Sequence, residues 1–227
     1  MSEYDLSKTV TQIIRQMKKP DSVDDELENV VVSPFVGKVG KTCSIDVIAK
    51  LQSKLSSDQM STYKSSRFCV FLGRGKDVLS LRFIHSILLR EVHHPDMSEL
   101  WFYYGSGNMC FSLYEFGLVS GLVCGGDEPR FSDYCNGGTF YGKFFSDENR
   151  ITRQVIESKF NDAVWENDDE AVKFAKVYFV KCFLLGSLKT TLIDSRFITL
   201  LDCSDFDDFL WGKYSFQLFV QSTKNKL

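Results

Sequence analysis

The chain has 227 residues, of which 44% are hydrophobic and 14% aromatic, including 20 phenylalanines. This apolar content is sufficient for a packed core and excludes an intrinsically disordered chain. The 27 basic and 30 acidic residues leave a net charge of −3, which provides no electrostatic basis for wrapping nucleic acid.

The sequence indicates neither a membrane segment nor a secretion signal. The uncharged stretch Trp101–Tyr114 is too short and too rich in turn residues to cross a bilayer. The first residues, MSEYDLSKTV, are acidic and lack the apolar centre of a signal peptide. The seven irregularly spaced cysteines are therefore expected to be reduced thiols, which predicts a nuclear or cytoplasmic protein.

The first 44 residues are expected to form a helix and an acidic linker ahead of the globular part. Residues 6–18 carry apolar side chains at helical spacing, and Pro20 ends that helix. Residues 21–29 are acidic and polar, and three valines follow. This pattern predicts an extension over residues 1–44 and a globular domain over residues 45–227.

Two helices are predicted between residues 44 and 95. The first covers 44–55 and is followed by a polar, serine-rich stretch that ends at Ser66 and by a compact apolar segment over 68–72. The second covers 78–92, with Asp77 as its N-cap, and Pro95 ends it.

A β-hairpin and a capped helix are predicted next. Leu100–Tyr104 suits a strand, Gly105–Asn108 are turn residues, and Met109–Phe111 pairs back as the second strand. Ser112 then predicts a helix N-cap, because Glu115 three residues later completes a capping box.

The rest of the chain is predicted to be helical, with one long connection. Residues 127–150 form that connection, and their aromatic side chains are expected to pack on the core. A short helix follows at 151–160. The longest helix begins at its cap Asp168 and ends near Leu185, with Lys181 among the lysines of its solvent face. The segment Phe206–Phe219 is too apolar for an exposed tail and is predicted to pack against the core.

An incomplete phosphate-binding loop lies near residue 40. Such a loop needs the pattern G-x-x-x-x-G-K-[ST], whose backbone amides wrap the phosphates. Gly40, Lys41 and Thr42 match its end, but Phe35 occupies the position of the first glycine and obstructs the close backbone approach. A surface turn is the favoured interpretation, and a nucleotide site that uses Lys41 and Thr42 is the alternative.

Histidines and cysteines are numerous enough for a metal site or a cysteine nucleophile. However, His85, His93 and His94 form no H-x-x-x-H pair, and no C-x-x-C pair occurs, although zinc sites usually need such spacing. A His–Asp–Cys order is weak support for a nucleophile, because its partners meet in space and not in sequence. Structural histidines and buried thiols are favoured, so no catalytic, metal or cofactor residue is predicted.

The basic residues form only small clusters. Lys38 lies near Lys41, and Arg67 lies near Arg74 and Lys76. Two or three charges are typical of a solvated loop, so direct contact with nucleic acid is not expected. No small-molecule substrate is expected either.

Four segments carry a resemblance to a known group of proteins: FIHSILLREV, ELWFYYGSGNMCFSLYEFGLVSGLVCG, KFAKVYFVKCFLLG and LLDCSDFDDFLWGKYSF. They resemble a plant domain of unknown function carried by transposon-derived genes, often upstream of a SUMO/ubiquitin-like cysteine protease domain. The second segment is also similar to plant mobile domains. The resemblance covers about residues 45–222 and implies a non-catalytic accessory module.

The protease domain itself is not found in this sequence. His94 is followed by Pro95 and not by tryptophan, and no glutamine stands just before a Cys-Gly pair. No catalytic residue of that protease can therefore be carried over.

The resulting expectation is a mainly helical α+β protein: one globular domain with a small antiparallel β-hairpin and an N-terminal helical extension. Its expected function is that of a transposon-derived protein-interaction module with an unidentified protein partner. The alternative is an enzyme, either a degenerate nucleotide-binding protein or a remnant of a ubiquitin-like cysteine peptidase.

Overall fold

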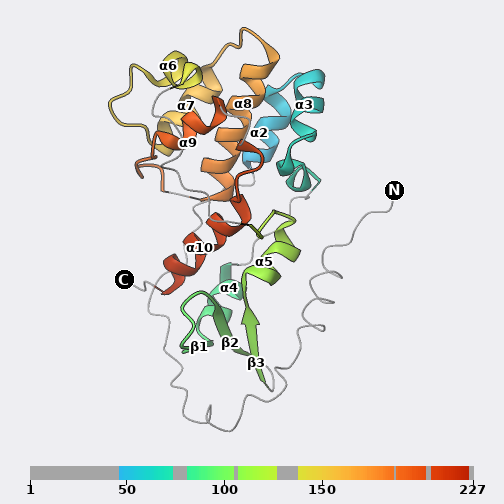
Figure 1. Cartoon of the computed structure of the whole chain (residues 1–227), viewed down its shortest axis with the longest axis vertical. Helices are drawn as coiled ribbons and strands as arrows, with labels where there is room; N and C mark the ends of the chain where they lie inside the picture. The colour runs from blue at the N-terminus through green and yellow to red at the C-terminus, as the bar shows by residue number, and fades with distance from the viewer. Residues whose placement is uncertain are drawn as a thin grey trace. The chain divides into compact units, whose positions relative to one another are not determined.

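The computed structural model describes residues 46–73, 81–104, 107–126, 138–186, 188–202 and 206–224. Helices dominate it, beside one small antiparallel sheet, so the predicted mainly helical α+β class is confirmed (Figure 1). The N-terminal helix and linker predicted for residues 1–44 lie outside the described residues. The chain forms two compact units: the sheet unit, which includes residues 79–124 and 212–227, and the helical unit, which includes residues 41–78 and 125–211.

The sheet has the strand order β1 (Glu91–Val92), β2 (Leu100–Tyr104) and β3 (Gly107–Phe111), with antiparallel neighbours. The predicted hairpin is confirmed. Its second strand begins two residues earlier than predicted, because Gly107 and Asn108 pair with β2 and do not form the turn.

The helix predicted over 78–92 is too long. α4 (Leu81–Leu88) ends at a turn in which the Arg90 N–H donates to the Ile87 carbonyl at 2.8 Å. The chain then enters β1, which pairs with β2, so Val92 belongs to the sheet and not to the helix. Val92 is β-branched and therefore suits a strand. The proposed cap, Asp77, lies outside the described residues.

α5 (Leu113–Ser120) begins directly after the predicted cap, Ser112. The Ser112 N–H donates to Glu115 Oε2 at 2.8 Å, and Ser112 Oγ accepts a backbone N–H of the first turn, which completes the capping box. Gly121 follows the helix at φ 72°, a left-handed conformation that favours glycine.

Ser112→Ala should lower the stability of α5 by about 1 kcal/mol, because the first-turn N–H groups lose their cap. We expect amide hydrogen exchange in α5 to become about fivefold faster. Ser222→Ala removes an exposed hydroxyl inside a helix and serves as the control. Equal exchange rates in α5 for the two variants would contradict the capping role.

One apolar cluster forms the core of the sheet unit. It lies between the sheet, α4, α5 and α10 (Trp211–Lys224), and Phe216 of α10 contacts the rings of Phe111 and Phe116 at centroid distances of 5.9 and 5.4 Å. Its most buried members are Leu88, Leu100, Phe102, Phe216 and Val220.

The helical unit is built around α8 (Asp168–Phe179), whose apolar residues are buried on nearly every side. Figure 1 shows α8 among its neighbours. The other elements of this unit are α2 (Asp46–Lys54), α3 (Ser57–Lys64), η2 (Arg67–Phe71), α6 (Thr139–Phe145), α7 (Arg153–Asp162), η4 (Val180–Leu184), α9 (Arg196–Thr199) and η5 (Leu200–Asp202).

Two predictions for the helical unit need correction, and one helix was not predicted. The serine-rich stretch after residue 55, to which no secondary structure was assigned, contains α3, because Ser56 and Gln59 form a capping box that starts this helix. The connection 127–150 contains α6. The cap of α8 is Asn167, whose side-chain oxygen accepts the Glu170 N–H at 2.9 Å, and Asp168 is the first helical residue.

The C-terminal segment packs as predicted over most of its length. Phe206, Phe209 and Trp211 are buried in the helical unit, and Phe216 is buried in the sheet unit. Leu218 and Phe219, however, lie on the exposed side of α10.

Candidate interaction surface

Lys41 and Thr42, the residues of the incomplete phosphate-binding loop, lie outside the described residues. Lys38, Arg74 and Lys76 of the small basic clusters do so as well. Arg67 is described, and its guanidinium binds the Asp208 carboxylate at 3.0 Å. This pairing fits a solvated surface charge better than a phosphate contact.

The histidines are not gathered into a metal site. Within the described ranges, no three His, Cys, Asp or Glu side chains form a group that could hold a metal ion. His94 instead stacks on the Trp101 ring at a centroid distance of 4.6 Å, and its Nδ1 accepts the Asp96 N–H at 3.1 Å. His94 is thus held by structural contacts.

Three of the four described cysteines do not resemble activated nucleophiles. Burial raises the pKa of Cys182 to about 12 and also raises the pKa of Cys124. Burial, together with the hydrogen bond from Cys110 to Glu99, raises the pKa of Cys110 to about 12. A reactive cysteine needs a lowered pKa, so these three thiols stay protonated near neutral pH.

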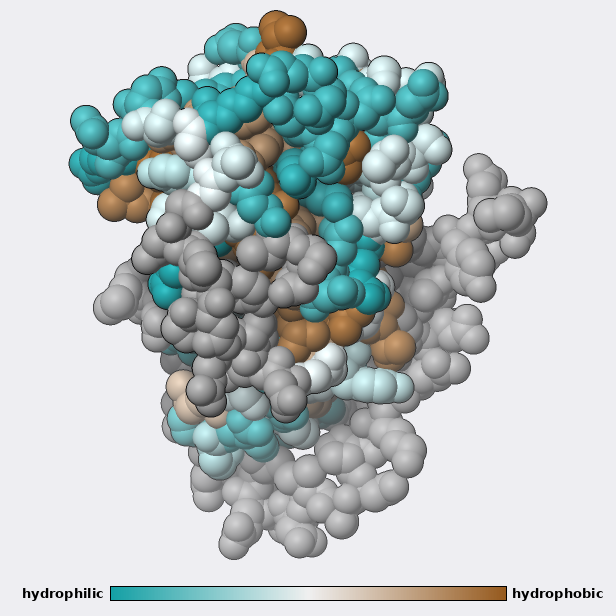
Figure 2. Space-filling view, turned by 45° about the horizontal axis from the view of Figure 1, so that its top comes forward, coloured by the Kyte–Doolittle hydropathy of each residue, from teal (hydrophilic) through white to brown (hydrophobic). Residues whose placement is uncertain are grey.

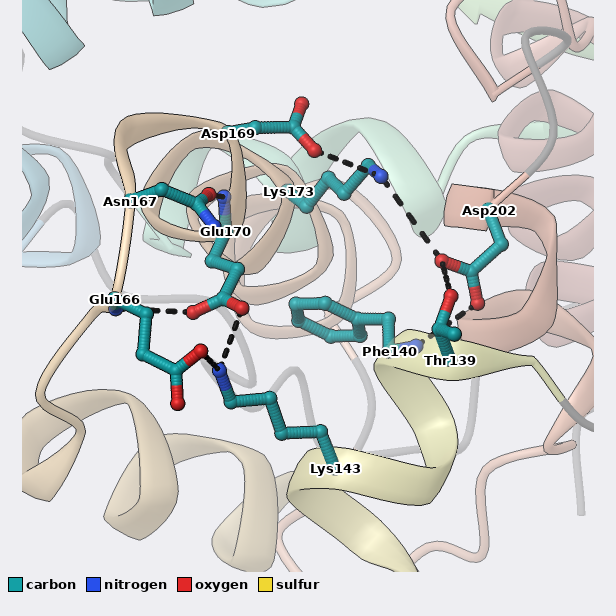
Figure 3. A network of polar contacts seen from close by, with 9 residues as sticks. All are labelled: Thr139, Phe140, Lys143, Glu166, Asn167, Asp169, Glu170, Lys173 and Asp202. Atoms are coloured by element: carbon teal, nitrogen blue, oxygen red, sulfur yellow. Dashed lines mark hydrogen bonds and ion pairs between the residues drawn. The ribbon is translucent and has the colours of Figure 1, made fainter.

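A network of polar contacts in the helical unit joins α6 to the start of α8 (Figure 3). Lys143 of α6 points between Glu166 and Glu170, with Nζ–O distances of 2.7 and 2.6 Å. These hydrogen bonds raise the pKa of Lys143, and Lys143 lowers that of Glu170. Lys143 forms ion pairs with both carboxylates, so the cluster holds α6 against the start of α8.

Asp202 of η5 extends the same network to the N-terminus of α6. Its Oδ2 accepts the Phe140 N–H at 3.0 Å, and its Oδ1 accepts the Thr139 hydroxyl at 3.2 Å. A carboxylate in this place caps the helix and complements the helix dipole. Because the network's carboxylates are engaged in capping or ion pairs, we interpret it as structural.

Shallow depressions of about 410 and 320 Å³ flank Lys159 of α7. The Lys159 ammonium binds Asp147 at 2.9 Å and Glu148 at 3.2 Å. A lysine that is already paired with two carboxylates is poorly suited to bind an anionic ligand, so this region carries no functional assignment.

α5 carries an exposed apolar surface. It is apolar on nearly all sides, and its one charged residue, Glu115, is used in the capping box. Its inward side chains, Leu113 and Phe116, pack on the core of the sheet unit. On the opposite side Tyr114 and Leu118 are 70% and 53% exposed, and their i,i+4 spacing places them on one face. We call this pair the α5 outer face.

Exposed apolar side chains are concentrated in the sheet unit. Of the thirteen large hydrophobic side chains exposed in the described residues, nine belong to the sheet unit, although the helical unit has more described residues. Figure 2 shows part of the helical unit's surface, where hydrophilic residues predominate. The nine are Leu89, Met97, Tyr103, Tyr104, Tyr114, Leu118, Val123, Leu218 and Phe219.

Lys181, predicted to lie on the solvent face of its helix, is instead only 4% exposed. It lies in the π-helical segment η4, and its Nζ is 3.1 Å from the centroid of the Phe197 ring. Burial lowers its pKa well below the usual value, and the nearby Asp194 carboxylate opposes this shift. The prediction failed because neighbouring elements cover the helix at Lys181, so it has no solvent face at this residue.

Lys181→Met should make the protein more stable at neutral pH, because the cost of burying the amine disappears. Folding lowers the pKa of Lys181. Between the folded-state pKa and about 10.4, the unfolded chain therefore binds more protons than the folded chain. In this pH window, Lys181 makes the free energy of unfolding of the wild type rise with pH.

Urea denaturation from pH 7 to pH 9.5 measures this effect as the difference in the free energy of unfolding between Lys181→Met and wild type. That difference should shrink as the pH rises. Lys189→Met changes an exposed lysine and should show no such trend. A Lys181→Met variant that is less stable than wild type at pH 7, with no pH trend, would contradict the argument.

Sequence reasoning missed the α5 outer face, although a signal was present. The segment Leu113–Ser120 contains one charged residue, and a helix with no polar face must be covered or must bind something.

None of the helices in the described ranges is both long and apolar enough to span a membrane.

Comparison with known proteins identifies the family. Residues 88–222, more than half of the chain, match the family described as a domain of unknown function, DUF1985. No curated protein and no solved structure matches the chain. The match includes all three strands, α5 and the central helix α8. The chain therefore belongs to the DUF1985 family.

Proposed function

We propose that this chain is a non-catalytic protein-interaction module whose sheet unit binds a protein partner through the α5 outer face. The observation that carries the proposal is the exposure of Tyr114 and Leu118 on a helix that has no polar face. Exposed apolar patches of this kind mark interaction sites in soluble proteins, and tyrosine is enriched at such interfaces.

The proposal extends to the origin and the location of the protein. The segments that resemble transposon-derived plant domains support a transposon-derived plant protein associated with ubiquitin-like protease genes. The seven irregularly spaced cysteines fit reduced thiols, which supports a nuclear or cytoplasmic location. We propose neither direct binding to nucleic acid nor binding of a small-molecule substrate.

Photo-crosslinking tests this function. Benzoyl-phenylalanine is placed at position 114 and, as the control, at Val164, an exposed residue of the helical unit. In nuclear and cytoplasmic extracts of plant cells, the probe at position 114 should capture a discrete protein that the probe at 164 does not. The same pattern from both positions, or no adduct at position 114, would contradict the proposal.

The enzyme alternative has its own test. The purified chain should neither hydrolyse ATP or GTP nor react with a ubiquitin-like active-site probe. Turnover that Lys41→Ala abolishes, or a probe adduct on one of the cysteines, would replace the proposal with the enzyme alternative.

A further inference from the structure

β3 is an open edge of the sheet. In the part of the chain that the structure describes, β3 pairs with β2 alone, and β2 lies between it and β1 (Figure 1). Edge strands are commonly protected by lysine, by other charged side chains or by proline, but β3 has the sequence GNMCF and contains none of these. Such an edge can accept an additional strand from a binding partner through main-chain hydrogen bonds.

A carboxylate lies behind this edge on the outer face of the sheet. Side chains alternate along a strand, so Cys110 shares a face with Trp101, the residue opposite it on β2. Glu99 Oε2 accepts hydrogen bonds from the Trp101 indole at 3.1 Å and from the Cys110 thiol at 3.4 Å. A residue added opposite Cys110 would have its Cβ about 5 Å from that of Cys110, so a long cationic side chain could reach Glu99.

The charges around β3 favour a cationic occupant. The negative charges of Asp96, Glu99 and Glu115 all raise the pKa of the Cys110 thiol, so these three carboxylates lie near β3. Lys224 lies at the Asp96 end, where its Nζ donates to the Asp96 carbonyl at 2.9 Å. A second copy of the chain would bring the same carboxylates against these, and like charges at close range disfavour such pairing.

The inner face beside the edge is apolar. Met109 and Phe111 face this side, because they lie opposite the buried Phe102 and Leu100. The Phe111 ring is 6.2 Å from the ring of Phe219, which is exposed. A strand added to β3 would therefore meet apolar side chains on one face and the Glu99 carboxylate on the other.

We propose that β3 binds an extended segment of a partner protein in which lysine or arginine alternates with apolar residues, by strand addition to the sheet. Its basic side chains lie over the outer face toward Glu99, and its apolar side chains lie beside Met109 and Phe111. This inference rests on the proposed function and names the chemistry of the partner segment.

Binding of synthetic heptapeptides to the full-length chain tests the inference, with backbone amide chemical shifts as the readout. The probe peptide alternates lysine and valine. One control peptide has glutamate in place of lysine, and a second keeps the lysine–valine sequence but carries N-methyl groups on alternate backbone amides, which prevents strand pairing. We expect the lysine–valine peptide to shift the amides of Gly107–Phe111 and both controls to bind much more weakly.

A Glu99→Gln variant should bind the lysine–valine peptide about fivefold more weakly, as expected for the loss of one partly exposed ion pair. Equal binding of the N-methylated peptide or of the glutamate peptide, shifts confined to other residues, or no binding would each overturn the inference. Concentration-dependent shifts of β3 in the chain alone would assign the edge to a second copy. The cross-link at position 114 does not use this edge, so the proposed function can stand when the strand-addition proposal fails.

Discussion

Trp211→Ala is expected to lower the free energy of unfolding of the helical unit by about 3–5 kcal/mol, the usual cost of removing a large aromatic side chain from a core. Trp211 is 2% exposed. Its ring lies 4.5 Å from the ring of Phe209 and 5.0 Å from that of Phe206, and its indole N–H donates to the Phe206 carbonyl at 2.7 Å. The substitution creates a cavity and also leaves that carbonyl without its donor.

Urea denaturation followed by circular dichroism measures this loss. Trp211→Phe keeps an aromatic ring but loses the hydrogen bond and part of the volume, so it should fall between wild type and Trp211→Ala. This intermediate variant keeps the prediction testable when the alanine variant does not fold. A loss below about 1 kcal/mol for Trp211→Ala would show that Trp211 is not part of the core.

Gly212→Ala should destabilise the sheet unit by about 2 kcal/mol, although alanine is the better helix former. A β-carbon at Gly212 would lie 2.5 Å from Cys124 Sγ, 2.6 Å from the Val123 carbonyl oxygen and 3.0 Å from Leu122 Cβ. The second of these contacts is with backbone, so relief requires the chain at residues 122–124 to move away from α10.

Gly142→Ala is the matched control, because Gly142 also lies in a helix and its β-carbon would meet nothing within 4 Å. That variant should be more stable than wild type by about 0.5–1 kcal/mol. Thermal denaturation of both variants compares the two effects, which should have opposite signs. Stabilisation by both substitutions would mean that the close approach at Gly212 does not exist.

Sequence patterns predicted the parts of this fold that depend on neighbouring residues. The Ser112–Glu115 box joins residues three positions apart, and the left-handed Gly121 follows directly on the same helix, so both could be read from the chain alone. The start of α3 at Ser56 has the same kind of signal, and a search for Ser-x-x-Gln would have found it.

Features that depend on distant residues could not be predicted in this way. Val92 lies in a strand because Trp101 is its partner, and nothing in residues 78–92 indicates that pairing. Lys181 is buried because other elements enclose its helix, whereas periodicity alone assigned it to a polar face. The open edge of β3 is likewise a property of strand order and not of the segment itself.

The α5 outer face could be predicted only in part. Its composition was visible in the sequence, since one charged residue in eight is unusual for a helix at the surface. Its exposure was not visible, because the same composition also suits a fully buried helix. The structure separates the two faces of α5, one on the core of the sheet unit and one carrying Tyr114 and Leu118.

The affinity of the captured partner for surface variants tests the central claim most directly. Calorimetric titration would compare wild type with Tyr114→Ser/Leu118→Ser, and with Val164→Ser/Leu188→Ser, which changes two exposed apolar residues of the helical unit. We predict that the α5 double variant keeps its thermal stability but binds at least about tenfold more weakly, as is typical of interface hot spots, and that the control binds like wild type. Wild-type affinity in the α5 double variant, or an equal loss in the control, would contradict an interaction site on α5.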